Sequence, residues 1–437
     1  MTYTETCHYL FNQIPMFEKQ GASGYKEGLE NTLKLDEHFG HPHRNYLTIH
    51  VAGTNGKGSC AHTISAILQQ CGYRVGLYTS PHLVDFSERI RINGQPIDEN
   101  YVVDFVAEEK SFFEPLKPSF FEVTTAMAFK YFSDMAVDIA VIEVGLGGRL
   151  DCTNIITPIL SIITNISYDH MQLLGNSLEQ IAMEKAGIMK KGVPVIIGET
   201  TPETRMVFEA VAQETGAPIV FAEDEQEVVG SEMVNNGIHY HTKHYGNIQG
   251  ELQGLYQEKN ANTILTAVRK LEELGYMYRF SDNSTSEVKG KEIADGFRSV
   301  CEITGLKGRW QTVSENPTVV CDTGHNVGGW EYISRQLSMV KCNKMHIVFG
   351  LVEDKDMDGI IALLPKDAIY YFTKAANKRA VSENVLRILA AKQGLTGNSY
   401  PSVIEACKSA RNAAAADDFV FIGGSSYVVA EFLKNSI

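Results

Sequence analysis

The sequence predicts an α/β protein with parallel sheets, divided into more than one domain. Short apolar runs rich in β-branched residues recur along the chain, and stretches with helical spacing separate them. Such alternation favours parallel sheets that are covered by helices on both faces. The chain has 437 residues, more than one ordinary hydrophobic core holds, so we expect two or three domains.

The elements follow from the apolar pattern. The expected strands, in chain order, are 46–51, 74–78, 138–144, 159–166, 193–197, 318–321, 346–349, 368–372 and 419–422. A helical pattern over 60–70 follows the first strand. Asn236-Gly237 separates two short apolar runs and predicts a hairpin, which we interpret as a small antiparallel elaboration. A hinge near 304–308 would divide the chain into domains 1–303 and 304–437.

Composition excludes several classes of partner. The formal net charge of −14 argues against nucleic acid and anionic membranes, which need clustered Lys and Arg. The eight cysteines form no Cys-x-x-Cys pair, the N-terminus lacks the features of a signal peptide, and no apolar run approaches the ~20 residues that span a bilayer. We therefore expect a reduced, cytoplasmic protein that binds neither nucleic acid nor a membrane.

The most informative motif is GTNGKGS at 53–59, between the first strand and the first helix. A strand that stops at a glycine turn, a lysine and a helix N-terminus are the parts of a phosphate cradle. The spacing differs from that of the usual P-loop, because two residues separate Gly53 from Gly56 and a glycine follows Lys57. The sequence predicts a phosphate site here, with a tight turn that binds nothing as the alternative.

Polar residues follow two further strands. Glu143 ends the apolar run 139–142, at the edge where open α/β sheets bind ligands. A carboxylate at that depth needs a partner, and Mg²⁺ or a salt bridge to Arg149 would supply it. Asp169-His170 comes after the next strand and offers a second ligand, although a histidine at a strand end more often makes only a hydrogen bond. Lys185 by itself is typical of a solvated helix lysine.

The second half of the chain repeats this arrangement. The strand at 318–321 leads into Asp322-Thr323-Gly324-His325-Asn326, and Arg309 lies near the hinge as a possible phosphate ligand. An arginine beside a tryptophan is more often a stacked surface pair. His239, His241 and His244 suggest a metal site, but a solvent-facing hairpin without an acidic or cysteine companion is a poor zinc site.

Taken together, the motifs resemble those of one family. They are HVAGTNGKGS at 50–59, TSPHL at 79–83 with ERI at 88–90, EVGLGGRLD at 143–151, DH at 169–170 and EKAGI at 184–188. The sequence is similar in these segments to folylpolyglutamate and dihydrofolate synthases, within the Mur ligase group. Ser-Pro-His-Leu and Gly-Leu-Gly-Gly-Arg-Leu-Asp separate this folate branch from the cell-wall Mur ligases.

The resemblance implies a P-loop-type ATP-binding α/β domain with the antiparallel elaboration, and a smaller C-terminal Rossmann-like α/β domain. It implies an ATP site of Asn55, Gly56, Lys57, Gly58, Ser59, Asn260, Arg309 and Asp322. It implies Mg²⁺ ligands Ser80, Glu143, His170 and Lys185, the last as a carbamylated lysine on a second Mg²⁺. It implies folate contacts at His82, Phe121, Glu122, Leu150 and Asp151, and glutamate contacts at His325 and Ser425.

The implied reaction is ligation of L-glutamate to dihydropteroate or tetrahydrofolate, driven by ATP through an acyl phosphate. Lys57, Lys185 and His325 would be the catalytic residues, ATP and two Mg²⁺ ions the cofactors, and K⁺ a further candidate ion. We expect a monomer that carries out both dihydrofolate and folylpolyglutamate synthesis. The alternatives are a monofunctional folylpolyglutamate synthase, a Mur ligase for nucleotide-linked peptides, and a nucleotide-hydrolysing switch.

Overall fold

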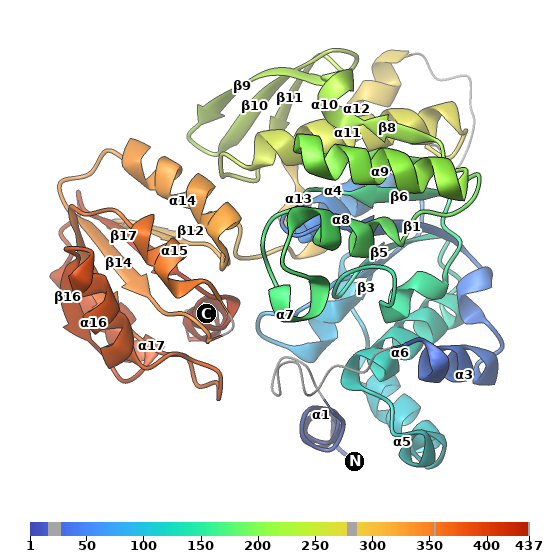
Figure 1. The fold of residues 1–437 in the computed structure, drawn as a ribbon, viewed down its shortest axis with the longest axis horizontal. Helices are drawn as coiled ribbons and strands as arrows, with labels where there is room; N and C mark the ends of the chain where they lie inside the picture. The colour runs from blue at the N-terminus through green and yellow to red at the C-terminus, as the bar shows by residue number, and fades with distance from the viewer. Residues whose placement is uncertain (16–27, 278–285, 354, 436–437) are drawn as a thin grey trace. The chain divides into compact units, whose positions relative to one another are not determined.

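The computed structural model describes residues 1–15, 28–277, 286–353 and 355–435 and divides into two compact units (Figure 1). The first unit comprises Met1–Ser167, Met171–Glu251 and Gln257–Leu306. The second comprises Tyr168–His170, Leu252–Tyr256 and Lys307–Ile437. The expected domain boundary between 303 and 304 stays a prediction. None of the helices in the described ranges is long and apolar enough to cross a bilayer.

The main sheet of the first unit has the strand order β4-β3-β2-β5-β1-β6-β7-β8. Its strands are β1 (Leu47–Ala52), β2 (Val75–Tyr78), β3 (Ile90–Ile92), β4 (Gln95–Pro96), β5 (Ile139–Glu143), β6 (Leu160–Ile163), β7 (Val195–Ile197) and β8 (Ile219–Phe221). The strands from β2 to β8 in this order are parallel, while β3 and β4 continue the sheet in antiparallel pairing. The predicted parallel strands are confirmed, and β3, β4 and β8 were not predicted.

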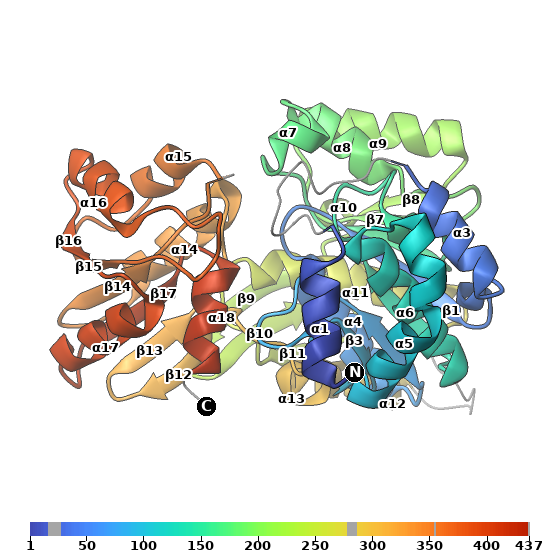
Figure 2. The ribbon, with the colours of Figure 1, turned by 90° about the horizontal axis from the view of Figure 1, so that it is seen from below.

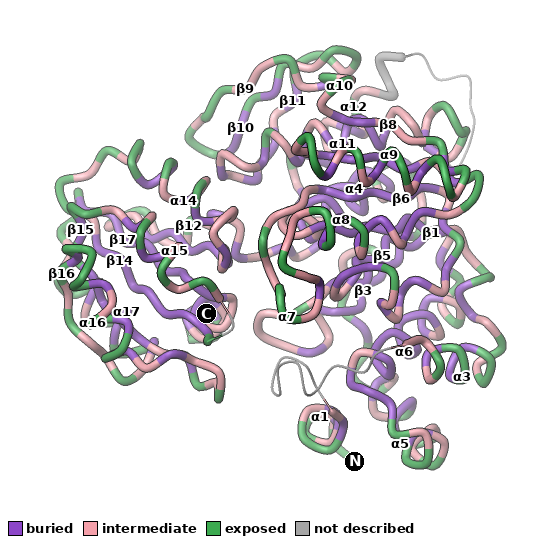
Figure 3. The backbone as a smooth tube through the Cα atoms, viewed as in Figure 1, coloured by how far each residue is buried: buried purple, intermediate pink, exposed green. Residues whose placement is uncertain are grey.

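Helices cover both faces of this sheet. The helices of the first unit are α1 (Tyr3–Asn12), α3 (Glu30–His38), α4 (Lys57–Gln70), α5 (Glu99–Leu116), α6 (Phe120–Asp134), α7 (Met171–Leu174), α8 (Leu178–Ala186), α9 (Pro202–Thr215), α10 (Ala222–Glu225), α11 (Gln257–Glu273), α12 (Ser286–Arg298) and α13 (Val300–Thr304), with the 3-10 turns η2 (Pro42–Arg44), η3 (Phe86–Arg89) and η4 (Cys152–Ile155). One core lies between the sheet and α4, α11 and α12. Separate cores lie under α5 and α6 and under α8 and α9. The central strands β1 and β5 are buried almost throughout (Figure 3).

The predicted hairpin is present. Strands β9 (Val228–Val234) and β10 (Gly237–Thr242) pair in antiparallel fashion, with Val234 opposite Gly237, and β11 (Asn247–Gly250) adds a further strand. Gly237 has φ of 136° at the turn, where a side chain would also meet the Gly250 carbonyl oxygen at 1.9 Å. The expectation that the hairpin histidines lack an acidic companion is wrong, because His244 Nδ1 lies 2.7 Å from Glu227 Oε2.

The second unit has a sheet of order β12-β13-β17-β14-β15-β16, parallel except for β12 (Figure 2). Its elements are β12 (Gln311–Glu315), β13 (Thr318–Cys321), α14 (Val327–Met339), β14 (Met345–Phe349), α15 (Met357–Ala362), β15 (Ala368–Phe372), α16 (Glu383–Lys392), β16 (Thr396–Ser399), α17 (Val403–Ala413), β17 (Phe419–Gly423) and α18 (Ser426–Lys434). Helices α14, α15 and α16 pack on one face, and α17 and α18 pack on the other. The predicted α/β class of both halves is confirmed.

Candidate functional site

The glycine-rich loop leaves β1 at Ala52 and enters α4 at Lys57. Gly53 has φ of 144°, and a Cβ there would lie 1.9 Å from Thr164 Oγ1. Gly56 has φ of 82°, and its Cβ would lie 2.4 Å from Asn260 Oδ1. Both glycines are therefore required by backbone conformation and by close approach. The first turn of α4 carries no acidic residue, so its N-terminus suits an anion.

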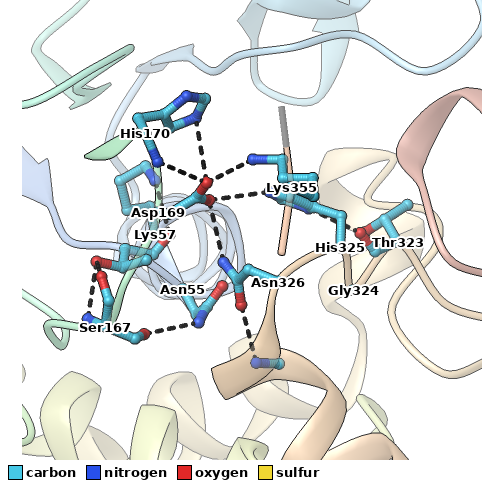
Figure 4. Close-up of polar contacts among 12 residues, drawn as sticks. Asn55, Lys57, Ser167, Asp169, His170, Thr323, Gly324, His325, Asn326 and Lys355 are labelled. Atoms are coloured by element: carbon cyan, nitrogen blue, oxygen red, sulfur yellow. Dashed lines mark hydrogen bonds and ion pairs between the residues drawn. The ribbon is translucent and has the colours of Figure 1, made fainter. Parts of the chain in front are cut away.

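Hydrogen bonds fix the shape of this loop (Figure 4). Lys57 Nζ donates to the carbonyl oxygens of Gly53 at 3.0 Å and Thr54 at 3.1 Å. The Asn55 side chain donates to Ser167 Oγ at 3.1 Å, and Thr54 Oγ1 donates to the Ser167 carbonyl oxygen at 3.2 Å. Because Ser167 follows β6, the loop after that strand holds the phosphate loop in place.

Helix α11 supplies the remaining neighbours of the loop. Asn260 Nδ2 donates to Gln257 Oε1 at 2.8 Å, and Gln257 Nε2 lies 3.4 Å from Ser59 Oγ. The structure therefore brings Asn260 beside the predicted phosphate residues, although about 200 residues of sequence separate them. Gln257 was not predicted, and a glutamine at a helix start gives no signal of such a role in the sequence.

Ser80, Glu143 and Lys185 meet the same edge of the sheet. Glu143 ends β5 beside Val51 of β1, is only 4 % exposed, and accepts a 3.2 Å hydrogen bond from the Ser80 backbone N–H. Lys185 on α8 is also 4 % exposed, and its Nζ donates to the Gly53 carbonyl oxygen at 3.0 Å. The interpretation of Lys185 as a solvated lysine is wrong, because α8 packs this side chain against the phosphate loop.

These residues fit a magnesium ion by the chemistry of their donors. A buried carboxylate and a serine hydroxyl are hard oxygen ligands of the kind that Mg²⁺ prefers. Throughout the described part of the chain, no three His, Cys, Asp or Glu side chains gather into a metal-binding group. Arg149, the alternative partner for Glu143, pairs with Glu184 at 2.8 Å.

In the second unit, Asp169 is the centre of a polar cluster (Figure 4). Its carboxylate lies 2.5 Å from Lys355 Nζ, 3.1 Å from Asn326 Nδ2 and 3.4 Å from His325 Nε2. Burial would raise the pKa of Asp169, but the hydrogen bond from His325 and the charges of His170 and Lys355 hold the pKa well below its usual value. His170 donates its backbone N–H to Asp169 Oδ1 at 2.8 Å.

The cluster contains a residue that the sequence did not reveal. Lys355 is 6 % exposed and forms a desolvated ion pair with Asp169, 186 residues away in the chain. It follows β14 within the acidic run 353–358, where a lysine is typical of a solvated loop. The one sequence feature that points to a role for Lys355 is its position after the end of β14, since polar residues at the carboxyl ends of parallel strands often form sites.

Asp322 and Arg309 lie at the end of β13. Asp322 accepts hydrogen bonds from Tyr256 Oη at 2.6 Å and from the Trp310 backbone N–H at 2.8 Å. Burial raises the pKa of Asp322, and the hydrogen bond from Tyr256 partly opposes that shift. The guanidinium of Arg309 hydrogen-bonds Thr323 Oγ1. Trp310 is 5 % exposed, so the alternative of a surface Arg-Trp stack is wrong.

Ser425 follows β17, the neighbour of β13 in the sheet. It is buried, and its hydroxyl accepts a 3.3 Å hydrogen bond from the Val428 backbone N–H as the N-cap of α18. His325 lies in the loop after β13, where its Nδ1 is 3.0 Å from the Thr323 carbonyl oxygen. The two predicted glutamate contacts therefore follow adjacent strands of one sheet.

Three of the predicted folate residues, Phe121, Leu150 and Asp151, lie in or against the loop after β5. The ring of Phe121 covers Gly145, where a Cβ would lie 2.4 Å from the ring, and Leu150 is partly exposed. His82 Nδ1 accepts a 2.8 Å hydrogen bond from Arg89 Nε. Burial, together with the Arg89 charge, lowers the pKa of His82 to about 3. The ring is therefore neutral and carries its proton on Nε2.

Two further predicted folate residues are engaged with their own chain. Glu122 closes a capping box, because its Oε2 accepts the Ser119 backbone N–H at 2.5 Å while Ser119 Oγ accepts the Glu122 N–H. The Ser-x-x-Glu spacing is the sequence signature of that cap. Asp151 accepts hydrogen bonds from the Leu146 N–H at 2.9 Å and from Thr153. Both carboxylates thus shape the protein around this loop.

Comparison with known proteins gives consistent matches over nearly the whole chain. The family model for the Mur ligase middle domain matches residues 51–268, and the model for the Mur ligase glutamate ligase domain matches residues 308–426. The dihydrofolate synthase/folylpolyglutamate synthase of Bacillus subtilis is 32 % identical over 425 residues, covering 94 % of this chain and 95 % of that relative.

Solved structures agree with these matches. E. coli FolC in complex with DHPP and ADP has a TM-score of 0.82 and 31 % identity, covering 100 % of this chain and 97 % of that one. A bifunctional folylpolyglutamate synthase/dihydrofolate synthase with Mn, AMPPNP and L-glutamate bound has a TM-score of 0.79 and 28 % identity. This match covers 100 % of this chain and 98 % of that one.

Proposed function

The chain belongs to the dihydrofolate synthase/folylpolyglutamate synthase family, and we propose that it is an ATP-dependent ligase that joins L-glutamate to a pteroate or folate carboxylate. The observation that carries this proposal is the arrangement around Gly53, where the phosphate loop, the Glu143 carboxylate and the Lys185 ammonium meet at one sheet edge. Relatives named for both synthase activities support a bifunctional enzyme.

The reaction proceeds in two displacements. A folate carboxylate oxygen attacks the γ-phosphorus of ATP, and the bond to the bridging oxygen breaks to release ADP. The glutamate amine then attacks the carbonyl carbon of the acyl phosphate, loses a proton and expels phosphate. Phosphate leaves far more readily than hydroxide, which is why ATP is consumed.

The phosphate loop performs the positioning in this scheme. The backbone amides at the start of α4 face the triphosphate, and Asn55, Gly56, Gly58 and Ser59 line it. Lys57 provides a positive charge beside the transferring phosphoryl group. Ser80, Glu143, His170 and Lys185 would hold the two Mg²⁺ ions, which when bound neutralise charge on the phosphate oxygens. K⁺ is a further candidate ion for this site.

We place a carbamate on Lys185. A lysine with an ordinary pKa near 10.4 is almost entirely protonated at pH 7, and a protonated amine does not react with CO₂. Burial of the side chain to 4 % exposure supports this placement, because a carbamate formed there would be shielded from water. The carbamate formed is an anion whose oxygens suit Mg²⁺, in keeping with the neighbouring Glu143.

The remaining residues divide between the two substrates. Arg309, Asp322 and Asn260 would contact ATP, and His325 and Ser425 would contact glutamate. His82, Phe121 and Leu150 would contact the pterin side, with Glu122 and Asp151 forming the frame around them. We assign ATP and folate to domain 1–303 and glutamate to domain 304–437, in a cytoplasmic monomer that uses neither nucleic acid nor a membrane.

The deciding experiment measures phosphate release with ATP, Mg²⁺ and glutamate in the presence of dihydropteroate, tetrahydrofolate or a nucleotide-linked muropeptide, with product masses recorded. We expect release and a mass gain of one glutamate with both pterin substrates. Activity with one pterin alone would assign a single branch. Activity only with the muropeptide, or release without any acceptor, would overturn the proposal in favour of a cell-wall ligase or a hydrolase.

A further inference from the structure

A line of buried polar side chains connects the strand of the phosphate loop to the loop on the folate side. His50 of β1 places Nε2 2.8 Å from Thr153 Oγ1 in η4. Thr153 Oγ1 donates to Asp151 Oδ1 at 2.5 Å. Asp151 Oδ2 accepts the Leu146 N–H at 2.9 Å. His50 and Thr153 are fully buried and Asp151 is 5 % exposed, so water does not compete for these contacts.

The positions of the protons on Thr153 and His50 follow from the acceptor role of the Asp151 carboxylate. Burial raises the pKa of Asp151, and the backbone N–H groups of Leu146 and Thr153 oppose that shift by stabilising the ionised carboxylate. The Thr153 hydroxyl proton points to that carboxylate, so the Thr153 oxygen is the acceptor toward His50. His50 must then carry its proton on Nε2. Burial, together with the charge of Lys190, lowers the pKa of His50 to about 3, consistent with a neutral ring.

The other ring nitrogen supports this direction. Nδ1 of His50 has no hydrogen-bond partner in the described part of the chain. An unpartnered lone pair in a core is tolerated better than an unpartnered N–H, so the proton belongs on Nε2. The hydrogen bond that His50 Nε2 donates to Thr153 is therefore consistent with a threonine hydroxyl that donates to Asp151.

This line of side chains runs from His50, near the phosphate loop, to Asp151, at the turn on the folate side. His50 lies on β1 opposite Ile142 of β5, three residues before Gly53, which directly follows that strand. Asp151 holds the turn that starts at Gly145, the glycine covered by the Phe121 ring. The available acceptor positions of its carboxylate are occupied by Thr153, Leu146 and the Gly145 amide. Asp151 consequently acts by holding this turn.

We propose that His50 and Thr153 are positioning residues that set the folate-side turn 145–151 against the phosphate loop. This inference rests on the proposed function and names how the folate carboxylate is aligned with the γ-phosphate. Misplacement of this turn by a fraction of an ångström lengthens the reacting distance, to which phosphoryl transfer is sensitive. The phosphate loop itself should keep its shape in such a variant, since its own hydrogen bonds are made by other residues, Asn55 to Ser167 and Lys57 to Gly53.

The test compares matched variants of Thr153. Thr153→Val keeps the shape of the side chain but removes both hydrogen bonds, whereas Thr153→Ser keeps the hydroxyl. We expect the valine variant to raise the KM for tetrahydrofolate and lower kcat, together about 30-fold in kcat/KM, with the KM for ATP within about 2-fold of wild type. The serine variant should stay within about 3-fold of wild type for all substrates.

Variants of His50 provide the second comparison. Gln places an N–H near the position of Nε2, while Leu does not, so His50→Gln should resemble wild type and His50→Leu should resemble Thr153→Val. The double variant His50→Leu/Thr153→Val should lose no more than either single variant, because both break one line. If Thr153→Val fails to fold, as judged by ADP binding and thermal unfolding, the His50 pair decides.

The outcomes separate this inference from the proposed function. A wild-type enzyme that ligates no folate overturns the proposed function, and this inference with it. A wild-type enzyme that ligates folate while the valine and serine variants behave alike, or lose folate and ATP affinity in parallel, overturns the positioning role alone. Nitrogen-15 NMR of labelled histidine, assigned with His50→Gln, should show Nε2 protonated and Nδ1 bare at pH 7, and the reverse tautomer would also overturn it.

Discussion

Lys185 Nζ donates a 3.0 Å hydrogen bond to the carbonyl oxygen of Gly53, the first glycine of the phosphate loop. The two residues are 132 positions apart and are brought together because α8 packs near the carboxyl end of β1. Lysines are rarely buried to 4 % exposure without a specific function. The contact places the Lys185 side chain beside the loop that we propose binds the triphosphate.

Replacing Lys185 by Ala should lower the ligation rate by about 10²-fold or more, because the proposed carbamate and its metal contacts are lost. Exposed Lys191→Ala, six positions further along the chain, serves as the control and should retain activity. Carbon-13 NMR with labelled bicarbonate should show a carbamate signal in the wild type that is absent from Lys185→Ala. Near-normal turnover of Lys185→Ala would sink the carbamate hypothesis.

Gly53→Ala should damage the phosphate loop severely. The new Cβ would lie 1.9 Å from Thr164 Oγ1 in a backbone conformation with φ of 144°. The matched control is Gly192→Ala, which has φ of 73° and nothing within 4 Å, and which should cost only about 1 kcal/mol of conformational strain. Thermal unfolding and the KM for ATP check the difference, and equal effects of the two substitutions would contradict it.

The strands that carry the site were predictable because their pattern is local. Runs such as 139–142 and 319–321 are apolar throughout, as strands buried on both faces must be, and each is followed by a polar residue, Glu143 or Asp322. Strands β3, β4, β8 and β16, at or next to the edges of their sheets, were missed because they are two to four residues long and lack a distinctive alternation. Their pairing depends on neighbouring strands, which sequence windows do not contain.

Site residues were predictable where they belong to one contiguous sequence motif. They were not predictable where only the fold brings distant segments into contact. The phosphate loop and Glu143 could be read from adjacent residues. The burial of Lys185 against Gly53 and the pairing of Lys355 with Asp169 join segments more than 100 residues apart, and Lys355 lies in an acidic run that suggests exposure. No local pattern distinguishes such a lysine from a solvated one.

Glu122 provides a test of whether a predicted folate contact is a cap instead. Glu122→Gln preserves an acceptor for the Ser119 N–H, so stability and the KM for tetrahydrofolate should change little. Glu122→Ala removes the acceptor and should destabilise the protein by about 1 kcal/mol, again with a nearly unchanged KM. A KM that rises strongly in both variants, with thermal stability unchanged, would instead assign Glu122 to substrate binding.

Breaking the ion pair of Lys355 with Asp169 should be costly. Both side chains are less than a tenth exposed, so Lys355→Met leaves a buried carboxylate with reduced compensation and should destabilise the protein by about 3 kcal/mol. Adding Asp169→Asn should recover part of that loss, because the unpaired charge is removed. Denaturant unfolding measures both effects, with exposed Lys341→Met as the control. Equal unfolding midpoints for wild type and Lys355→Met would refute the coupling.

His82 should make the protein less stable in acid. Its pKa is about 3 in the folded protein, below the ordinary value of 6.5, so between these pH values the unfolded chain binds more protons. Stability therefore rises with pH across this window and levels off above 6.5. His82→Gln retains an acceptor for Arg89 but cannot titrate. Between pH 7 and pH 5, the free energy of unfolding should therefore fall less in the variant than in the wild type, by on the order of 2 kcal/mol. Thermal unfolding at the two pH values measures this difference, and parallel pH profiles for wild type and variant would show that His82 is not held neutral by the fold.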